Sequence, residues 1–225
     1  MEWKFHNPQF VMDSAPELPS KFIVNGFWSG HRNFAYDLVH FLKPRTIVEL
    51  GTFYGTSLFS FCQAVRDAEL PTICYAVDTW KGDPHGGYYG DEVYENVKTV
   101  ASREFSKTAR LLRNDFDDAL SFFEDGSIDL LHIDGYHTYE AVSHDYTTWY
   151  PKLAEKSIVL FHDIAEHQND FGVYLLWEKL KEHPHLEFLH SSGLGVLFPK
   201  VVPENFQKLI QHKDTIIEQY SNQQN

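Results

Sequence analysis

Carboxylates and histidines stand together in two short segments of the chain. Residues 132–137 read HIDGYH, and residues 162–163 read HD. Two carboxylates and an imidazole, with positions left for substrate oxygens, suit a site for Mg²⁺ or Mn²⁺. We therefore predict that Asp134, His162 and Asp163 bind a divalent metal.

The same segments contain a candidate proton acceptor. A metal of this kind lowers the pKa of a coordinated hydroxyl and holds it while an electrophile approaches. His137 follows Asp134 by three residues, and an imidazole near its ordinary pKa suits proton transfer at neutral pH. We name His137 and Asp134 as catalytic candidates. His132 lies inside a predicted strand, so we interpret it as a packed core residue.

A glycine loop, ELGTFYGTS at residues 49–57, could hold a cofactor. A dinucleotide-binding fingerprint needs glycine at position 53, where the backbone approaches a pyrophosphate, but this chain has Phe53. The spacing of Gly51 and Gly55 still predicts a tight turn that exposes backbone groups to a small ligand. Glu49 stands beside the turn and could accept a hydrogen bond from an ammonium group.

Polar residues also follow the next two predicted strands. The carboxylate of Asp78 could accept hydrogen bonds from two ribose hydroxyls, and Asn114 with Asp115 could bond the amine of an adenine. Together with the glycine loop, these residues suit a nucleoside that carries a cation rather than a diphosphate. S-adenosylmethionine fits that description.

The elements that must position these residues alternate between strands and helices. Strands are predicted at residues 46–50, 73–77, 109–112, 128–133 and 157–161, and helices at 29–42, 56–67, 92–105, 116–123, 139–149 and 173–180. This alternation predicts an α/β protein with a doubly wound, Rossmann-like parallel sheet. Ligands bind beyond the carboxyl ends of the strands in such sheets, which is where the candidate residues stand.

The remaining segments flank this sheet domain, which we place at residues 28–200. Residues 1–27 predict an extended arm or lid, and residues 201–225 a helix (204–220) and a tail. Residues 186–189 and 194–198 predict a hairpin. The loop KGDPHGGYYGD at 81–91 is a second candidate lid. Trp80, Tyr88 and Tyr89 in or beside that loop are candidates for stacking on a sugar ring.

Composition restricts the partners. The 225 residues include 19 Lys and Arg against 32 Asp and Glu, a net charge of −13 that disfavours nucleic acid and anionic lipid surfaces. No apolar stretch approaches the roughly 20 residues that span a bilayer, and the polar start lacks a signal sequence. The two cysteines, Cys62 and Cys74, do not make a disulfide framework. We expect a cytoplasmic protein with a small-molecule or glycan substrate, and a homo-oligomer is possible.

The runs IVELGTFYGTS, YAVDTWKGD, IDLLHIDGYHTYEAVSHD, IVLFHDI and GLGVLF resemble the class I S-adenosylmethionine-dependent methyltransferases. Within that class, the chain is similar to the subfamily associated with glycosyltransferases, and in turn to macrolide sugar O-methyltransferases and cephalosporin hydroxylase-like proteins. The resemblance covers roughly residues 27–198. It implies a seven-stranded sheet whose last strand is antiparallel.

The resemblance also implies roles for single residues. It matches Glu49, Gly51, Gly55 and Ser57 to the cofactor loop, Asp78 to the ribose-binding acid, Asn114 and Asp115 to the adenine contacts, Asp134 to the first metal ligand, and His162 with Asp163 to the pair that completes the metal site. His137 falls where catechol O-methyltransferase has its catalytic lysine. The chain departs from the pattern at His162, which replaces an oxygen ligand, and at Tyr136, where the macrolide sugar enzymes have an aspartate base.

The leading interpretation is a divalent-metal-assisted O-methyltransferase that uses S-adenosylmethionine and acts on a hydroxyl of a sugar or glycoconjugate. Two alternatives stay open at this point. The ligand types of His162, Asp163, Asp134 and His137 also occur in non-haem iron oxygenases. The chain could instead be a non-catalytic binding module for glycan assembly.

Overall fold

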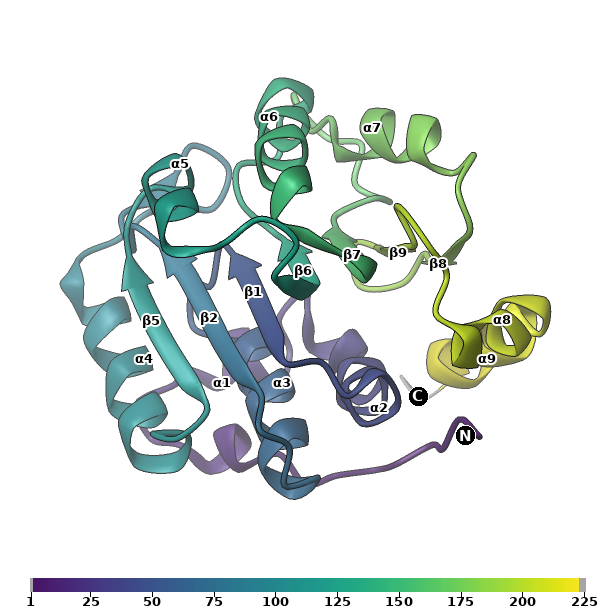
Figure 1. Cartoon of the computed structure of the whole chain (residues 1–225). Coiled ribbons are helices and arrows are strands. Elements are labelled where there is room, and N and C mark those ends of the chain that lie inside the picture. Colours follow the sequence, from purple (N-terminus) through teal and green to yellow (C-terminus); the bar gives the residue numbers. More distant parts are fainter. Residues whose placement is uncertain (1, 223–225) are drawn as a thin grey trace.

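The computed structural model describes residues 2–222 as an α/β fold built on one seven-stranded sheet (Figure 1). The strand order is β5-β2-β1-β6-β7-β9-β8. The strands are β1 (Thr46–Leu50), β2 (Ile73–Asp78), β5 (Ala109–Arg113), β6 (Ile128–Ile133), β7 (Leu153–His162), β8 (His185–Phe188) and β9 (Leu194–Leu197). All neighbours from β5 to β7 pair in parallel, and β9 is antiparallel to β7 and β8. The predicted doubly wound sheet with an antiparallel last strand is confirmed.

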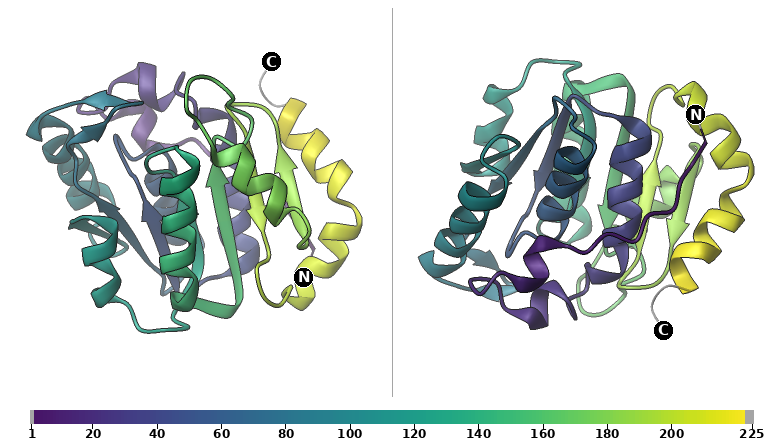
Figure 2. Two further views of the ribbon diagram at one scale, coloured as in Figure 1. Left: turned by 90° about the horizontal axis from the view of Figure 1, so that it is seen from above. Right: turned by 90° about the horizontal axis from the view of Figure 1, so that it is seen from below.

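Helices cover both faces of this sheet (Figures 1 and 2). One face carries α2 (Arg32–Leu42), α3 (Thr56–Asp67) and α4 (Asp91–Glu104), and the other carries α5 (Phe116–Ala119), α6 (Tyr139–Trp149) and α7 (Val173–Leu180). Successive strand residues point to opposite faces, so Ile47 joins the first core and Val48 the second. This two-sided burial explains why the strands read as continuous apolar runs.

The N-terminal arm is packed against the domain. It includes a 3-10 turn (Val11–Ser14) and the short helix α1 (Ser20–Ile23), and it buries Phe10, Met12 and Leu18 in the first core. Figure 2 (right) shows the arm starting beside the C-terminal helices and crossing the outer side of the helices on that face. There, Trp3 donates a hydrogen bond to the hydroxyl of Tyr220, which donates to the buried Asp37.

Several local predictions need correction. The predicted helix at 204–220 is two helices, α8 (Glu204–Gln211) and α9 (Lys213–Ser221), because the chain leaves helical geometry at His212. The helix predicted at 116–123 becomes a 3-10 turn (Leu120–Phe122) after α5. Strand β7 starts four residues before the predicted 157, and the loop at 81–91 contains a small hairpin, β3 (Gly82–Asp83) and β4 (Gly87–Tyr88).

No helix within residues 2–222 is long and apolar enough to cross a membrane.

Candidate functional site

The parallel register brings the candidate residues to one edge of the sheet. Leu50, Ile133 and Phe161 are neighbours across β1, β6 and β7, so the residues that follow them leave the sheet side by side. The amide of Asp134 donates to the carbonyl of Leu50 at 2.9 Å. The glycine loop and the acid–histidine segments therefore form one continuous site.

Gly51 makes the closest approach between these two parts. It has φ of +86°, and a Cβ atom built on it would lie 2.0 Å from the backbone oxygen of Asp134. Only glycine combines this left-handed conformation with so near a neighbour. The predicted turn is thus required for Asp134 to lie directly against the glycine loop.

The residues predicted to bind a metal converge at the ends of β6 and β7. Nδ1 of His162 lies 3.3 Å from Oδ1 of Asp134 and 3.0 Å from Oδ2 of Asp163, and one ligand atom from each of the three residues lies within 4.8 Å of the others. Nε2 of His137 lies 3.0 Å from Oδ2 of Asp163 and 3.7 Å from Oδ1 of Asp134. The structure therefore brings together all four residues named as metal ligands or catalytic candidates.

The electrostatics of this cluster follow from its opposite charges. Burial alone would lower the pKa of His162, but the carboxylates of Asp163 and Asp134 raise that pKa well above its ordinary value. Burial would raise the pKa of Asp134, but His162 and His137 hold it well below the usual range, and the pKa of Asp163 falls to about 2 for the same reason. Without a metal, the cluster is two ion pairs.

The pKa of His137 differs from the one that the sequence predicts. Its burial would lower its pKa, but hydrogen bonds and charge from Asp134 and Asp163 raise the pKa to about 10. The expectation of an imidazole near its ordinary pKa is therefore wrong for the metal-free protein. His137 holds its proton at neutral pH unless another cation neutralises the two carboxylates.

The donor set fits a divalent cation. Nε2 of His162 lies 3.1 Å from the carbonyl oxygen of Ser191, which can only accept, so this nitrogen carries a proton. A divalent cation between the two carboxylates would displace the proton of Nδ1 and accept the lone pair of that nitrogen. A far nitrogen held by a carbonyl is the usual orientation of a metal-binding histidine. Asp163, at φ of +61°, occupies a left-handed conformation that aims its carboxylate at the same space.

His132 is packed inside the molecule, as predicted, and connects the arm to the glycine loop. The indole N–H of Trp28 donates to Nε2 of His132 at 3.1 Å, and a tryptophan N–H can only donate. The proton of His132 is therefore on Nδ1, which donates to Glu49 at 3.0 Å. The second oxygen of Glu49 accepts from the Thr52 hydroxyl at 2.8 Å. Neither Trp28 nor Thr52 was predicted as a site residue, because nothing in their spacing along the chain indicates contact with His132 or Glu49.

The contribution of the hydrogen bond from Trp28 to His132 can be measured by comparison with Trp149, a buried tryptophan whose indole N–H has no hydrogen-bond partner among the described residues. We expect Trp28→Phe to cost about 1–3 kcal/mol more in free energy of unfolding than Trp149→Phe, because only the first change leaves a buried acceptor unpaired. Both indoles are buried, but Nε1 of Trp149 has no hydrogen-bond partner among the described residues. Urea denaturation of both variants measures the difference. Equal losses of stability would argue against the bond.

The residues predicted to bind the cofactor line the same edge. Glu49 is completely buried and supports the loop through Thr52 and His132. Asp78 accepts hydrogen bonds from the backbone amides of Thr52, Phe53 and Trp80 at 2.8, 3.0 and 2.6 Å, and so holds the loop in shape. Their contacts with a cofactor stay predictions.

The other cofactor candidates are spread along the ends of β1 and β5. Gly55, at φ of +82°, precedes α3, and Ser57 lies buried in the first turn of that helix. Asn114 is half-buried directly after β5, and Asp115 is exposed just before α5. Each of them is thus near enough to the carboxyl edge to belong to the site.

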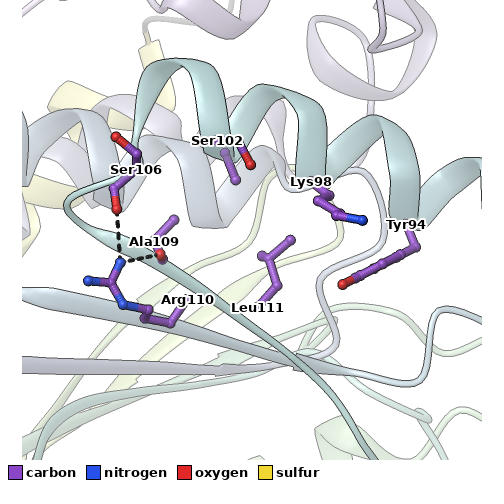
Figure 3. A pocket seen from close by; sticks show the side chains of 8 residues that line it. Tyr94, Lys98, Ser102, Ser106, Ala109, Arg110 and Leu111 are labelled. Atoms are coloured by element: carbon purple, nitrogen blue, oxygen red, sulfur yellow. Dashed lines mark hydrogen bonds between the residues drawn. The ribbon is translucent and has the colours of Figure 1, made fainter.

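Of two hollows on the surface, one lies away from this site and the other lies beside it. A groove of about 250 Å³ lies between α4 and the start of β5 (Figure 3), where Arg110 donates to the carbonyls of Ser106 and Ala109. It is remote from the carboxyl end of β5 and does not belong to the site. A cavity of about 520 Å³ is lined by residues of segment 24–33 and by Ser191, the residue that holds His162.

Of the three aromatic residues proposed to stack on a sugar, one is excluded. Trp80 is fully buried and donates its indole N–H to the carbonyl of Phe53, so it is not available to a ligand. Tyr89 is half-buried against Phe53, with ring centroids 5.1 Å apart. Tyr88 is 77% exposed at the hairpin and is the candidate that remains open.

A family model described as a methyltransferase domain matches residues 48–164, which span the glycine loop and the acid–histidine cluster. The chain belongs to this methyltransferase domain family. It is also 48% identical over 181 residues to the uncharacterized protein y4gI of Sinorhizobium fredii. That alignment covers 80% of this chain but 20% of y4gI, so the chain spans about a fifth of the length of that relative.

Solved structures of methyltransferases share the fold of this domain. TomG of Streptomyces achromogenes, an O-methyltransferase in complex with S-adenosylmethionine, has a TM-score of 0.56 at 13% identity, over 85% of this chain and 96% of TomG. A putative caffeoyl-CoA O-methyltransferase of Staphylococcus aureus has a TM-score of 0.56 at 14% identity, over 73% and 80% of the two chains. A methyltransferase of Geobacter sulfurreducens has a TM-score of 0.55 at 14% identity, over 74% and 77%. The chain therefore shares its fold with methyltransferases, one of which was solved with S-adenosylmethionine.

Proposed function

We propose that the chain is an S-adenosylmethionine-dependent, divalent-metal-assisted O-methyltransferase that acts on a hydroxyl of a sugar or glycoconjugate. The observation that carries this proposal is the contact between the two halves of the site. The cofactor loop at Gly51 lies against the backbone of Asp134, and Asp134 belongs to the acid–histidine cluster. A methyl donor on the loop and an oxygen held at the cluster would be neighbours.

Methyl transfer requires little covalent chemistry from the protein. The acceptor oxygen forms a bond to the methyl carbon while the bond from that carbon to the sulfonium breaks, and the hydroxyl loses its proton. The protein has to align the three atoms and assist the loss of the proton. Glu49, Gly51, Gly55, Ser57, Asp78, Asn114 and Asp115 would position the cofactor along the ends of β1, β2 and β5.

Asp134, His162 and Asp163 would hold the metal, and His137 would receive the proton of the hydroxyl. A bound divalent cation would lower the pKa of that hydroxyl and neutralise the two carboxylates. Those carboxylates are what raise the pKa of His137 to about 10, so their neutralisation would return the imidazole toward a pKa suited to a base. His137 therefore becomes a proton acceptor only in the form of the protein that is ready to react.

The proposed sugar acceptor draws support from the cavity beside His162. Its wall contains Asn25, Ser29, Asn33 and two glycines, polar residues that suit hydroxyl-rich ligands, and also Arg32, whose guanidinium pairs with Asp13. The exposed Phe27 at its rim offers an apolar face for a sugar ring. Subfamily membership and cytoplasmic location belong to the same proposal. An iron oxygenase has no comparable support, since the comparisons indicate a methyltransferase domain.

Removal of the metal tests the proposal. We expect labelled methyl transfer from S-adenosylmethionine to a panel of sugars and glycoconjugates to stop after treatment with EDTA and to return with Mg²⁺ or Mn²⁺. Calorimetry should show one S-adenosylhomocysteine bound per chain with or without EDTA, because the cofactor residues are separate from the metal ligands. Absence of cofactor binding would refute the assignment as an S-adenosylmethionine-dependent methyltransferase. Methyl transfer that persists in EDTA would refute the requirement for a divalent metal.

A further inference from the structure

A second group of metal-binding side chains lies beside the proposed catalytic site. His85 extends from the β3–β4 hairpin to His137, and the two Nδ1 atoms lie 3.4 Å apart. A carboxylate oxygen of Asp83 completes a set of three ligand atoms that lie within 4.8 Å of one another. Asp83 and His85 have no part in the function proposed above.

The separation of the two nitrogens matches a tetrahedral ion. Histidine nitrogens bind Zn²⁺ at about 2.0–2.1 Å, so two of them on a tetrahedral centre lie about 3.3–3.4 Å apart. The rings are oriented for this by Phe171, which stacks on His85 with centroids 4.4 Å apart and on His137 with centroids 4.8 Å apart. The interplanar angles of these two stacks are 16° and 10°, so both rings follow the plane of Phe171.

The far nitrogens of both rings are held by carboxylates. Nε2 of His85 lies 2.6 Å from Oδ1 of Asp170, and Nε2 of His137 lies 3.0 Å from Oδ2 of Asp163. With a proton on each Nε2, both Nδ1 atoms could donate lone pairs to a bound cation, which would displace the Nδ1 proton that His137 holds in the metal-free protein. A histidine that binds zinc usually donates its other ring N–H to a carboxylate, a carbonyl or water, and both of these rings have a carboxylate in that place.

The backbone around these residues is also organised. Oδ1 of Asp83 accepts from the amides of His85 and Gly86 at 2.6 and 2.8 Å, which fixes the carboxylate relative to the imidazole. The amide of Gly172 donates to the carbonyl of His137 at 2.8 Å and holds the adjoining Asp170 and Phe171 in place. The ligands come from the hairpin and from the loop after β6, so an ion bound to all three would join these segments.

We propose that Asp83, His85 and His137 form a second metal site, selective for Zn²⁺ or a similar imidazole-preferring ion, that clamps the β3–β4 hairpin to the catalytic loop. Two imidazoles with one carboxylate favour zinc over Mg²⁺, which prefers oxygen ligands. The three protein ligands leave a fourth position open. Zinc on Nδ1 of His137, with Nε2 paired to Asp163, would occupy both ring nitrogens, so the zinc-bound form could not use His137 as the proposed proton acceptor. Zinc binding can still be measured on the metal alone, separately from methyl transfer.

Calorimetric titration of the full chain with Zn²⁺ in excess Mg²⁺ tests the site. We expect His85→Gln to bind one equivalent of Zn²⁺ fewer than the wild type. The matched control is His144→Gln, since His144 also pairs with a carboxylate, Asp117 at 2.9 Å, but on the exposed surface of α6. This control should keep the wild-type number of equivalents. Absence of zinc binding, or the same stoichiometry in His85→Gln, would overturn the proposal.

A second variant separates metal binding from packing. Asp170 is 66% exposed and is not a ligand, so Asp170→Asn should fold normally and weaken Zn²⁺ binding about tenfold through the orientation of His85. Zn²⁺ should also slow amide hydrogen exchange of residues 82–88 in the wild type and not in His85→Gln. Unchanged affinity in Asp170→Asn together with unchanged exchange would contradict the clamp.

Discussion

Asp134→Asn is expected to reduce methyl transfer at least about a hundredfold while leaving the binding of S-adenosylhomocysteine within a few fold of wild type. Loss of an outer-shell partner alone costs about 10- to 100-fold in affinity or activity at metal sites, and Asp134 is a proposed ligand. The cofactor loop contacts the backbone of Asp134, which asparagine preserves. Single-turnover transfer and calorimetry measure the two effects. Wild-type turnover of this variant would refute a catalytic or metal-binding role for Asp134.

The same variant has a predicted effect on stability in the metal-free protein. Asp134 faces His162 at 3.3 Å and His137 at 3.7 Å, so its loss leaves an excess of positive charge in a largely buried cluster and costs about 2–4 kcal/mol. The pKa of Asp134 is lowered, so its contribution is present above the ordinary aspartate pKa, about 4. The pKa of His137 is raised to about 10, so the contribution of its pairing is complete below its ordinary pKa and is lost as the pH rises through 10.

The difference in unfolding free energy between wild type and Asp134→Asn is therefore expected to be largest between about pH 4 and 6.5 and to decline toward pH 10. Urea denaturation in EDTA across this range measures it. Asp117→Asn is the matched control, because Asp117 also pairs with a histidine but is 59% exposed. It should change stability by less than about 1 kcal/mol. A difference that grows with pH would contradict the assigned ion pairs.

Gly51→Ala is expected to destabilise the fold by about 3 kcal/mol or more and to abolish cofactor binding. Its left-handed backbone costs an alanine about 1–2 kcal/mol. In addition, the new Cβ would meet the carbonyl oxygen of Asp134 at 2.0 Å, and neither backbone can yield without disturbing the pairing of β1 with β6. At about 2–4 °C per kcal/mol, the melting temperature should fall by roughly 6–12 °C.

Gly126→Ala is the control for the conformational part of this effect. Gly126 has φ of +71°, similar to Gly51, but a Cβ built on it meets nothing within 4 Å. We expect it to cost only about 1–2 kcal/mol and to leave cofactor binding unchanged. Differential scanning calorimetry and titration with S-adenosylhomocysteine compare the two variants. Equal effects would mean that the contact between the cofactor loop and Asp134 is unimportant.

The amino-acid sequence is enough to predict the alternation of strands and helices and the sheet edge at which the candidate site residues lie. Strands β1 and β6 and helix α3 begin and end where the pattern predicted, because apolar runs closed by glycine or aspartate leave few alternatives for a buried strand. Parallel strands place their carboxyl ends together, so Asp134 had to lie between Gly51 and Asp163 at one edge of the sheet once the strand order was β1-β6-β7. Membership of the family follows from the same segments.

The protonation states and partners of these residues arise only in the folded chain. The pKa of His137 depends on two carboxylates from different strand ends, which spacing along the chain cannot evaluate. Trp28 reaches His132 across 104 positions, and His85 reaches His137 across 52, because packing of the arm and the hairpin brings them there. Local periodicity indicates which side of a helix or strand is apolar. The charge of a side chain, the position of its proton and the close approach of two backbones depend on residues from different elements, which meet only when the chain is folded.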